Sequence, residues 1–216
     1  MAAPTRSLSH SPLFEFGIGI ADPTDLVLQA CKKMVKQISR YDRVAGTHAE
    51  KIKVPGYSSL TCSPRTAILV KRTLTTQAHE IEDIGIEHTI VEIILTRKTQ
   101  QSLYLANLYS PPRKQLHQCD HFVHELRQTN NGNRLIIVGD FNAPHVAWGY
   151  HRTTKKGVRV HDAAQQHGLT PWNDLLHPTR LGNSVSRDTN PFLTFTRDVH
   201  NATWTRLPTL YGVTIK

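Results

Sequence analysis

The sequence predicts an α+β fold in which two packed β-sheets carry helices on their outer faces. Short segments rich in β-branched and aromatic residues follow one another between polar turns, and two later segments have the apolar spacing of amphipathic helices. Four branched apolar residues in a row at 135–138 indicate a strand that is covered on both faces. Runs of strands with a few interposed helices favour two layers of sheet with helices outside.

Residues 1–41 are expected to form a poorly specified N-terminal segment that contains one helix. Ser, Pro and Gly are mixed with a short apolar patch up to about residue 21, without a clean period. Asp22 and Pro23 then mark a helix start, because Asp suits the N-cap and Pro the first helical position. The residues that fall on one face of this predicted helix are Val27, Cys31, Met34 and Ile38.

The middle of the chain is predicted to contain consecutive antiparallel strands at 66–71, 89–95 and 102–109. Pro111 and Pro112 end the third strand, and an apolar stripe from Leu116 to Leu126 predicts a helix that ends at 130–133. The buried strand at 134–138 follows, then a short helix at 158–167 that Gly168 closes. Further strands are expected at 169–172, 193–196 and 209–215.

Composition restricts the classes of function. The net charge of +9 and a pI near 9.7 favour polyanionic partners. Three widely spaced cysteines argue against a disulfide framework or a thiolate zinc site. No apolar run is long enough to span a bilayer and no secretion signal is present, so an intracellular protein without a membrane partner is expected.

The end of the buried strand carries the most informative side chains. Gly139 allows a turn, after which Asp140 and Asn142 offer a carboxylate and a carboxamide two residues apart. Hard oxygen ligands of this kind suit a magnesium-dependent phosphodiester site. A purely structural Gly-Asp turn remains the alternative, since many α/β proteins end a hydrophobic strand in this way.

The strand that ends near Pro111 can supply further groups to the same pocket. The helix between the two strands can return the chain so that they lie side by side, which would direct Tyr109 toward Asp140. A phenol can donate a hydrogen bond to a phosphate oxygen, and Asn107 can fix a neighbouring carboxylate. An ordinary half-buried strand tyrosine is the alternative for Tyr109.

These motifs together resemble the endonuclease/exonuclease/phosphatase superfamily, and within it the apurinic-like endonuclease domain of non-LTR (LINE-type) retrotransposons. The resemblance covers about residues 42–207, so a domain over 42–216 that is truncated at its C-terminus is expected. Its motifs are Pro55-Gly56-Tyr57, Ala67 to Val70, Asn107 to Pro112, Gly139 to Asn142 with Ala143, His145, Trp148 and Gly149, Gly168-Leu169, Asn173-Asp174, Pro178-Thr179-Arg180, Leu193-Thr194-Phe195 and Trp204.

The resemblance implies a four-layered α/β sandwich, with edges that are incomplete here, and a cleft that uses Mg2+ or Mn2+. Asp140 would position or deprotonate the attacking water, and Asn142 would bind the phosphate or the metal shell; these two are the implied metal residues. Tyr109 would support the scissile phosphate, Asn107 belongs to the same turn, and Thr179 would line the site.

The sequence departs from the family pattern at both edges of the cleft. Gly46 stands where the principal Glu ligand is expected, and Glu50 could replace it only if the local backbone were rebuilt. Phe192 stands in place of an Asp, the expected Ser-Asp-His end is missing, and Phe14 to Gly17 carries no metal-directed Asn, with Glu15 as a weak substitute. Metal binding is therefore expected to be weakened or lost, and activity severely impaired.

Three functions remain open at this stage. The first is a metal-dependent DNA endonuclease of retrotransposon origin, nuclear by family and part of a longer polyprotein. The second is a catalytically inert remnant that binds nucleic acid, and the third is a phosphatase of the same superfamily. Lys155 and Lys156 are interpreted as part of a solvated surface, so the sequence predicts no defined binding patch.

Overall fold

The computed structural model describes residues 56–82, 84–95, 101–112, 118–173, 175–176, 178–180 and 187–199, and the strand backbones 14–20, 26–32, 202–206 and 211–215. Over these residues the strands form a six-stranded, a four-stranded and a two-stranded sheet. In the same part of the chain, no helix is both long and apolar enough to span a bilayer.

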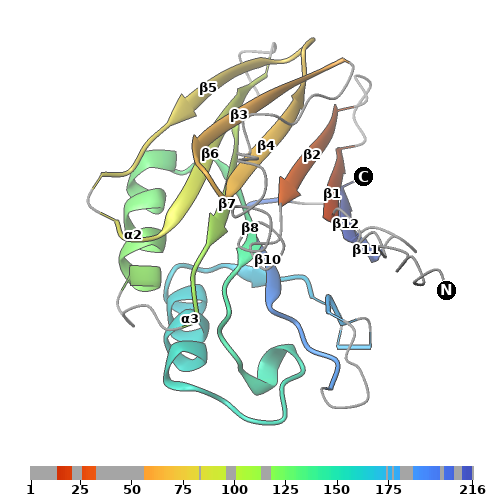
Figure 1. The fold of residues 1–216 in the computed structure, drawn as a ribbon. Helices are drawn as coiled ribbons and strands as arrows, with labels where there is room; N and C mark the ends of the chain where they lie inside the picture. The colour runs from red at the N-terminus through yellow and green to blue at the C-terminus, as the bar shows by residue number, and fades with distance from the viewer. Residues whose placement is uncertain are drawn as a thin grey trace, which may run out of the picture.

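The six-stranded sheet has the order β5-β6-β7-β8-β10-β9. Its strands are β5 (Thr75–His79), β6 (Glu87–Ile94), β7 (Leu103–Tyr109), β8 (Arg134–Asp140), β9 (Thr170–Pro171) and β10 (Phe192–Arg197). Helix α2 (Gln118–Asn130) connects β7 to β8, which pair in parallel, whereas the other pairs are antiparallel. The predicted return of the chain that brings these two strands side by side is confirmed (Figure 1).

The four-stranded sheet has the order β1-β2-β4-β3. Its strands are β1 (Phe14–Ile20), β2 (Leu26–Lys32), β3 (Tyr57–Ser63) and β4 (Thr66–Lys71). The predicted antiparallel pairing of 66–71 with 89–95 is therefore wrong, because β4 and β6 lie in different sheets. The unpredicted strand β5 occupies the place beside β6, and β4 pairs with β3 and β2.

The predicted N-terminal helix is also wrong over 26–32, where the chain forms β2. This strand pairs with β1 from Phe14↔Lys32 to Ile20↔Leu26, and with β4 through Leu28 and Gln29. Pairing with β1 along the whole strand, and with β4 at these two residues, satisfies backbone groups outside a helix, and tertiary context of this kind overrides a helical pattern. The remainder of the predicted helix, before and after β2, lies outside the described residues.

Strands β11 (Ala202–Arg206) and β12 (Tyr211–Ile215) form an antiparallel pair, which confirms the predicted strand at the C-terminal end of the sequence. Strand β12 lies against β1 (Figure 1). The two ends of the described chain therefore meet at the same side of the molecule.

Two apolar cores hold the layers together. One lies between the sheets and contains Ile68 and Val70 of β4 with Val91, Leu105, Val138 and Phe192 of the larger sheet. The other joins the opposite face of the larger sheet to α2 and α3 (Lys155–Gln166), and it includes Phe122, Leu126, Ile137, Val160 and Phe195. The structure confirms the predicted α+β fold of packed sheets with outer helices, and both described α-helices cover the six-stranded sheet.

Candidate active site at the ends of β7 and β8

Paired residues form a row across the ends of four adjoining strands. Glu87 of β6 pairs with Tyr109 of β7, Tyr109 with Asp140 of β8, and Asp140 with Phe192 of β10. Side chains two positions apart on a strand share a face, and Val138 belongs to the core between the sheets. The row therefore lies on the face toward the smaller sheet, and Asp140 and Tyr109 are neighbours there.

Gly139 allows the close approach that positions Asp140. A Cβ atom at this residue would lie 2.2 Å from the carbonyl oxygen of Leu108, so a side chain would collide with the backbone of β7. Beyond it, the Ser110 amide donates to the Asp140 carbonyl oxygen at 2.8 Å, which extends the pairing to the end of both strands. Asp140 itself is only 8% exposed.

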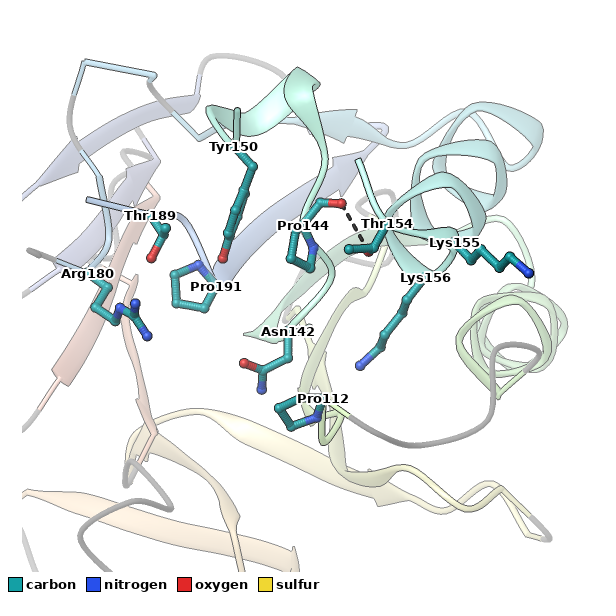
Figure 2. Close-up of a pocket in the computed structure, with 10 residues that line it drawn as sticks. All are labelled: Pro112, Asn142, Pro144, Tyr150, Thr154, Lys155, Lys156, Arg180, Thr189 and Pro191. Carbon is teal, nitrogen blue, oxygen red and sulfur yellow. Dashed lines mark hydrogen bonds between the residues drawn. The ribbon is translucent and has the colours of Figure 1, made fainter. Parts of the chain in front are cut away.

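Asn142 turns away from the strand in the left-handed conformation, with φ of +45°. Its Nδ2 donates to the Ser110 carbonyl oxygen at 3.2 Å, so its amide is fixed to the turn that follows β7. Figure 2 shows the side chain near the centre of a pocket of about 510 Å³. Asn tolerates the left-handed region better than most residues, which suits this position both structurally and chemically.

Lys156 is buried beside Asn142, and its predicted place on a solvated surface is wrong. Its side chain is only 6% exposed, and its Nζ donates to the carbonyl oxygens of Ser110 at 3.2 Å and Pro111 at 2.9 Å. Burial lowers the pKa of this ammonium group to about 8. Helical spacing offered a signal, because Lys156 precedes buried Val160 by four residues on the same helix face.

Tyr109 has a cationic neighbour that the sequence did not reveal. The guanidinium carbon of Arg65 lies 5.1 Å from the centre of the Tyr109 ring, and the Arg65 Nε lies 3.3 Å from Glu87 Oε1. Burial raises the pKa of the Tyr109 phenol, Glu87 adds to this rise, and Arg65 opposes it. Arg65 comes from the hairpin between β3 and β4, so only the packing of the two sheets brings it here.

Asn107 lies deeper between the sheets than Tyr109. It is buried, and its Nδ2 donates to the Ala67 carbonyl oxygen of β4 at 3.0 Å, whereas its Oδ1 has no hydrogen-bond partner. This contact joins β7 of one sheet to β4 of the other.

Thr179 is buried behind the start of β10. Its amide donates to Asn190 Oδ1 at 2.7 Å, and its hydroxyl lies 3.4 Å from the Phe192 carbonyl oxygen and 3.3 Å from the Phe192 nitrogen. Asn190 in turn donates to the Trp148 carbonyl oxygen at 3.0 Å. Thr179 thus fixes the backbone beside Asp140.

The structure places an apolar ring where the sequence departs from the family pattern. Phe192 is 1% exposed and belongs to the core between the sheets, directly across the ladder from Asp140. Gly46 and Glu50 lie outside the described residues, and Glu15 falls in β1, of which only the strand backbone is described.

The side-chain oxygen atoms at the end of β8 suit a magnesium site with few protein ligands. Among the described residues, no group of three or more His, Cys, Asp and Glu side chains could hold a metal ion. The Asp140 carboxylate and the Asn142 carboxamide nevertheless supply hard oxygen atoms. Because Mg2+ often keeps several waters and binds through one or two carboxylates plus substrate phosphate, these residues fit such an ion without forming a closed cage.

Comparison with known proteins identifies the family. Residues 103–212, about half of the chain, match the family model described as endonuclease-reverse transcriptase. The chain belongs to this family. The matched region contains Tyr109, Asp140, Asn142 and Thr179, so the expected site residues lie inside the endonuclease-reverse transcriptase match.

A solved structure shares the fold of this endonuclease-reverse transcriptase family member. The endonuclease domain of TRAS1, a telomere-specific non-LTR retrotransposon, matches with a TM-score of 0.58 and 18% identity over 75% of this chain and 77% of that chain. An endonuclease/exonuclease/phosphatase family protein from Bacteroides thetaiotaomicron matches with a TM-score of 0.48 and 12% identity. This match covers 82% of this chain and 70% of that chain. No curated protein matches the sequence. The family-model match confirms the expected endonuclease family, and the likeness to the TRAS1 endonuclease domain supports the expected fold.

Proposed function

We propose that this chain is a divalent-metal-dependent phosphodiesterase that nicks DNA, with weakened catalysis. The observation that carries the proposal is the register of Tyr109 with Asp140, which puts a phenol and a carboxylate on one face at the ends of adjoining strands. Asn142 follows within two residues and lines the adjacent pocket. These groups suit hydrolysis by an activated water beside a phosphate.

Each side chain has a chemical role in this proposal. The Asp140 carboxylate orients the attacking water and accepts its proton, and the Asn142 amide contacts a phosphate oxygen. Tyr109 donates a hydrogen bond to the phosphate, and burial raises the pKa of its phenol, which disfavours the phenolate. The Arg65 guanidinium beside the ring adds positive charge near the developing negative charge.

Asp140 and Asn142 would hold the implied Mg2+ or Mn2+. A bound divalent ion supplies Lewis acidity to the phosphoryl oxygen and lowers the pKa of its water. With Gly46 in place of the expected Glu ligand, we expect weak affinity for the metal.

Nicking of a supercoiled plasmid tests the proposal. We expect slow conversion to the open circle at high Mg2+ or Mn2+, none in EDTA, and none with Asp140→Ala. Tyr109→Phe should reduce the rate while leaving the protein folded by circular dichroism. Equal nicking by the protein and by Asp140→Ala would show that any cleavage comes from a contaminant and would refute the proposal.

The second candidate function is DNA binding without catalytic activity. The buried Phe192 ring favours it, because an apolar side chain in the row beside Asp140 can neither accept a proton nor bind an imidazole. Salt-sensitive DNA binding without nicking at any metal concentration would establish this inert form.

The family also supports a proposed cellular setting. We expect the chain to act beside a reverse transcriptase in a longer retrotransposon polyprotein, and in the nucleus, where chromosomal DNA is the target. Fluorescence of a tagged protein would test the location, with exclusion from the nucleus as the contradicting result.

A further inference from the structure

Two histidine rings stack where the loop between β8 and α3, residues 141–154, meets α3. The His145 ring of this β8–α3 loop is nearly parallel to that of His161 on α3, with centroids 4.4 Å apart and 18° between the planes. The Trp148 ring lies 4.9 Å from that of His145. A Cβ atom at Gly157, one turn before His161, would lie 3.1 Å from the His145 Cβ. His145 is therefore in close contact with one face of α3.

His145 also begins the short 3₁₀ helix η2 (Val146–Trp148). Its Nδ1 accepts a hydrogen bond from the Ala147 amide at 3.1 Å, so Nδ1 carries no proton and the neutral ring is protonated at Nε2. A doubly protonated imidazole has a donor at both nitrogens. Protonation of His145 therefore breaks this bond and sets two N–H groups against each other.

The charges around the His145 ring come from α3. Among the described residues, His161 and Asp162 are the titratable groups that act on it, and Trp148 of its own loop is neutral. Burial lowers the pKa of His145, His161 lowers it further, and Asp162 opposes the change. Asp162 Oδ1 lies 3.6 Å from His161 Nδ1, so a charged His161 has an ion-pair partner of its own. Two stacked imidazolium rings would repel each other.

The β8–α3 loop borders the candidate active site. Its residues Pro144, Tyr150 and Thr154 line the pocket that contains Asn142 (Figure 2). The Tyr150 amide donates to the His145 carbonyl oxygen at 3.2 Å, so the backbone at the pocket wall is tied to the histidine that stacks on α3. Movement of His145 would therefore change the shape of this wall.

We propose that the stack of His145 on His161 is a proton-sensitive contact that holds the β8–α3 loop closed at neutral pH and releases it in mild acid. Release frees His145 from its burial and from the charge on α3, so the open loop binds a proton more readily than the closed loop. Above pH 6.5, the ordinary pKa of histidine, both forms are neutral and the closed form prevails. Opening is favoured as the pH falls from 6.5 through the lowered pKa of the closed form, about tenfold for each unit between them.

Hydrogen exchange followed by mass spectrometry, corrected for the intrinsic effect of pH, tests the contact. Between about pH 7.5 and pH 5, protection of the β8–α3 loop should fall about tenfold in the parent protein, with β7 and β8 unchanged. His145→Asn should reduce this fall to less than about twofold, because Asn accepts from the Ala147 amide as a preferred capping residue and does not titrate. The matched control is His121→Asn, at an exposed position on α2, which should behave as the parent does.

Proton NMR of the histidine rings gives a second measurement. His161→Phe keeps an aromatic ring in the stack but removes its charge, so the pKa of His145 should rise relative to the parent. An unchanged pKa overturns the proposal. So does equal loss of protection in the parent and His145→Asn, no loss in the parent, or a loss that extends to β7 and β8. These measurements contain neither metal nor nucleic acid, so they are independent of the test of nicking.

Discussion

The Lys156 side chain shows how one residue can connect a helix, a turn and a pocket. Its charge is buried, and the two carbonyl oxygens that accept from Nζ offset only part of the lost hydration. The folded-state pKa of about 8 is the consequence. Burial of this amine therefore makes the stability of the fold depend on pH.

The sign of that dependence follows from proton binding. The pKa of Lys156 falls from 10.5 to about 8 on folding, so between these values the unfolded chain binds more protons and stability rises with pH. Below about pH 8 the folded state bears the full cost of the buried charge. Relative to Lys156→Met, the parent should gain up to about 3 kcal/mol between pH 8 and 10.5. Urea unfolding of both proteins measures this gain, and a constant difference would contradict it.

Phe192 shows why a single reversion toward the family pattern should cost stability. We expect Phe192→Asp to lower the free energy of unfolding by about 3–5 kcal/mol, because it removes a buried ring and introduces a carboxylate beside Asp140. Phe192→Leu should cost less than about 1.5 kcal/mol. Chemical denaturation distinguishes the two, and similar stabilities for both variants would mean that the site already admits water. Gly46→Glu must accompany the reversion for a fair test of activity.

At the scale of elements, α3 and the loop after β8 pack without space for a side chain. A Cβ atom at Gly157 would lie 1.9 Å from the Pro144 carbonyl oxygen. The same carbonyl accepts from the Thr154 backbone amide at 2.9 Å, and the Thr154 hydroxyl caps α3 by accepting from the Gly157 amide at 3.1 Å. The start of α3, with Lys156, is therefore fixed to this loop.

Gly157→Ala tests that contact. Helix propensity alone favours Ala by about 1 kcal/mol, but the collision with Pro144 should make the variant less stable and move Lys156 away from the carbonyl oxygens of Ser110 and Pro111. The temperature of thermal unfolding should fall. Gln165→Ala, at an exposed position on the same helix, serves as control with little expected change. A Gly157→Ala protein that is more stable than the parent would exclude the close approach.

Local patterns predicted some elements and failed for others, for physical reasons. Clear patterns of apolar residues predicted strands β7 and β8 and helices α2 and α3, and the structure confirms these elements. Strand β2 carries Val27 and Cys31 at a helical spacing, and its pairing with β1 and β4 decides the outcome. Strands β3 and β5 were missed because they are polar and partly exposed.

At the scale of the whole molecule, Asn107 helps to hold the two sheets together. Its amide satisfies a buried carbonyl of Ala67 across the interface. Asn107→Leu has similar volume but leaves that carbonyl without its donor, so we expect a loss of about 1–3 kcal/mol in unfolding free energy. Urea denaturation measures the loss, with exposed Gln77→Leu on β5 as control. A neutral Asn107→Leu variant would show that the sheets pack independently of this bond.

Charged side chains are also unevenly distributed over the molecule. One pocket is lined by Lys155, Lys156 and Arg180, and another, elsewhere on the molecule, is lined by Glu80, Glu82 and Glu87. Total charge predicted a polyanionic partner but not where it would bind, because net charge contains no positions. The arrangement of β8, α3 and the bridge between Arg180 and Thr189 brings the cations together.

The sequence alone determined the family, the two described α-helices, and the strands that end at Tyr109 and Asp140, because motif order and short periods are local properties of the chain. The tertiary structure decided which side chains meet there. Arg65 reaches Tyr109 from the other sheet, Lys156 is buried beneath Asn142, and Phe192 faces the core beside Asp140. Each contact joins residues that are distant along the chain, and sheet packing and register bring them together.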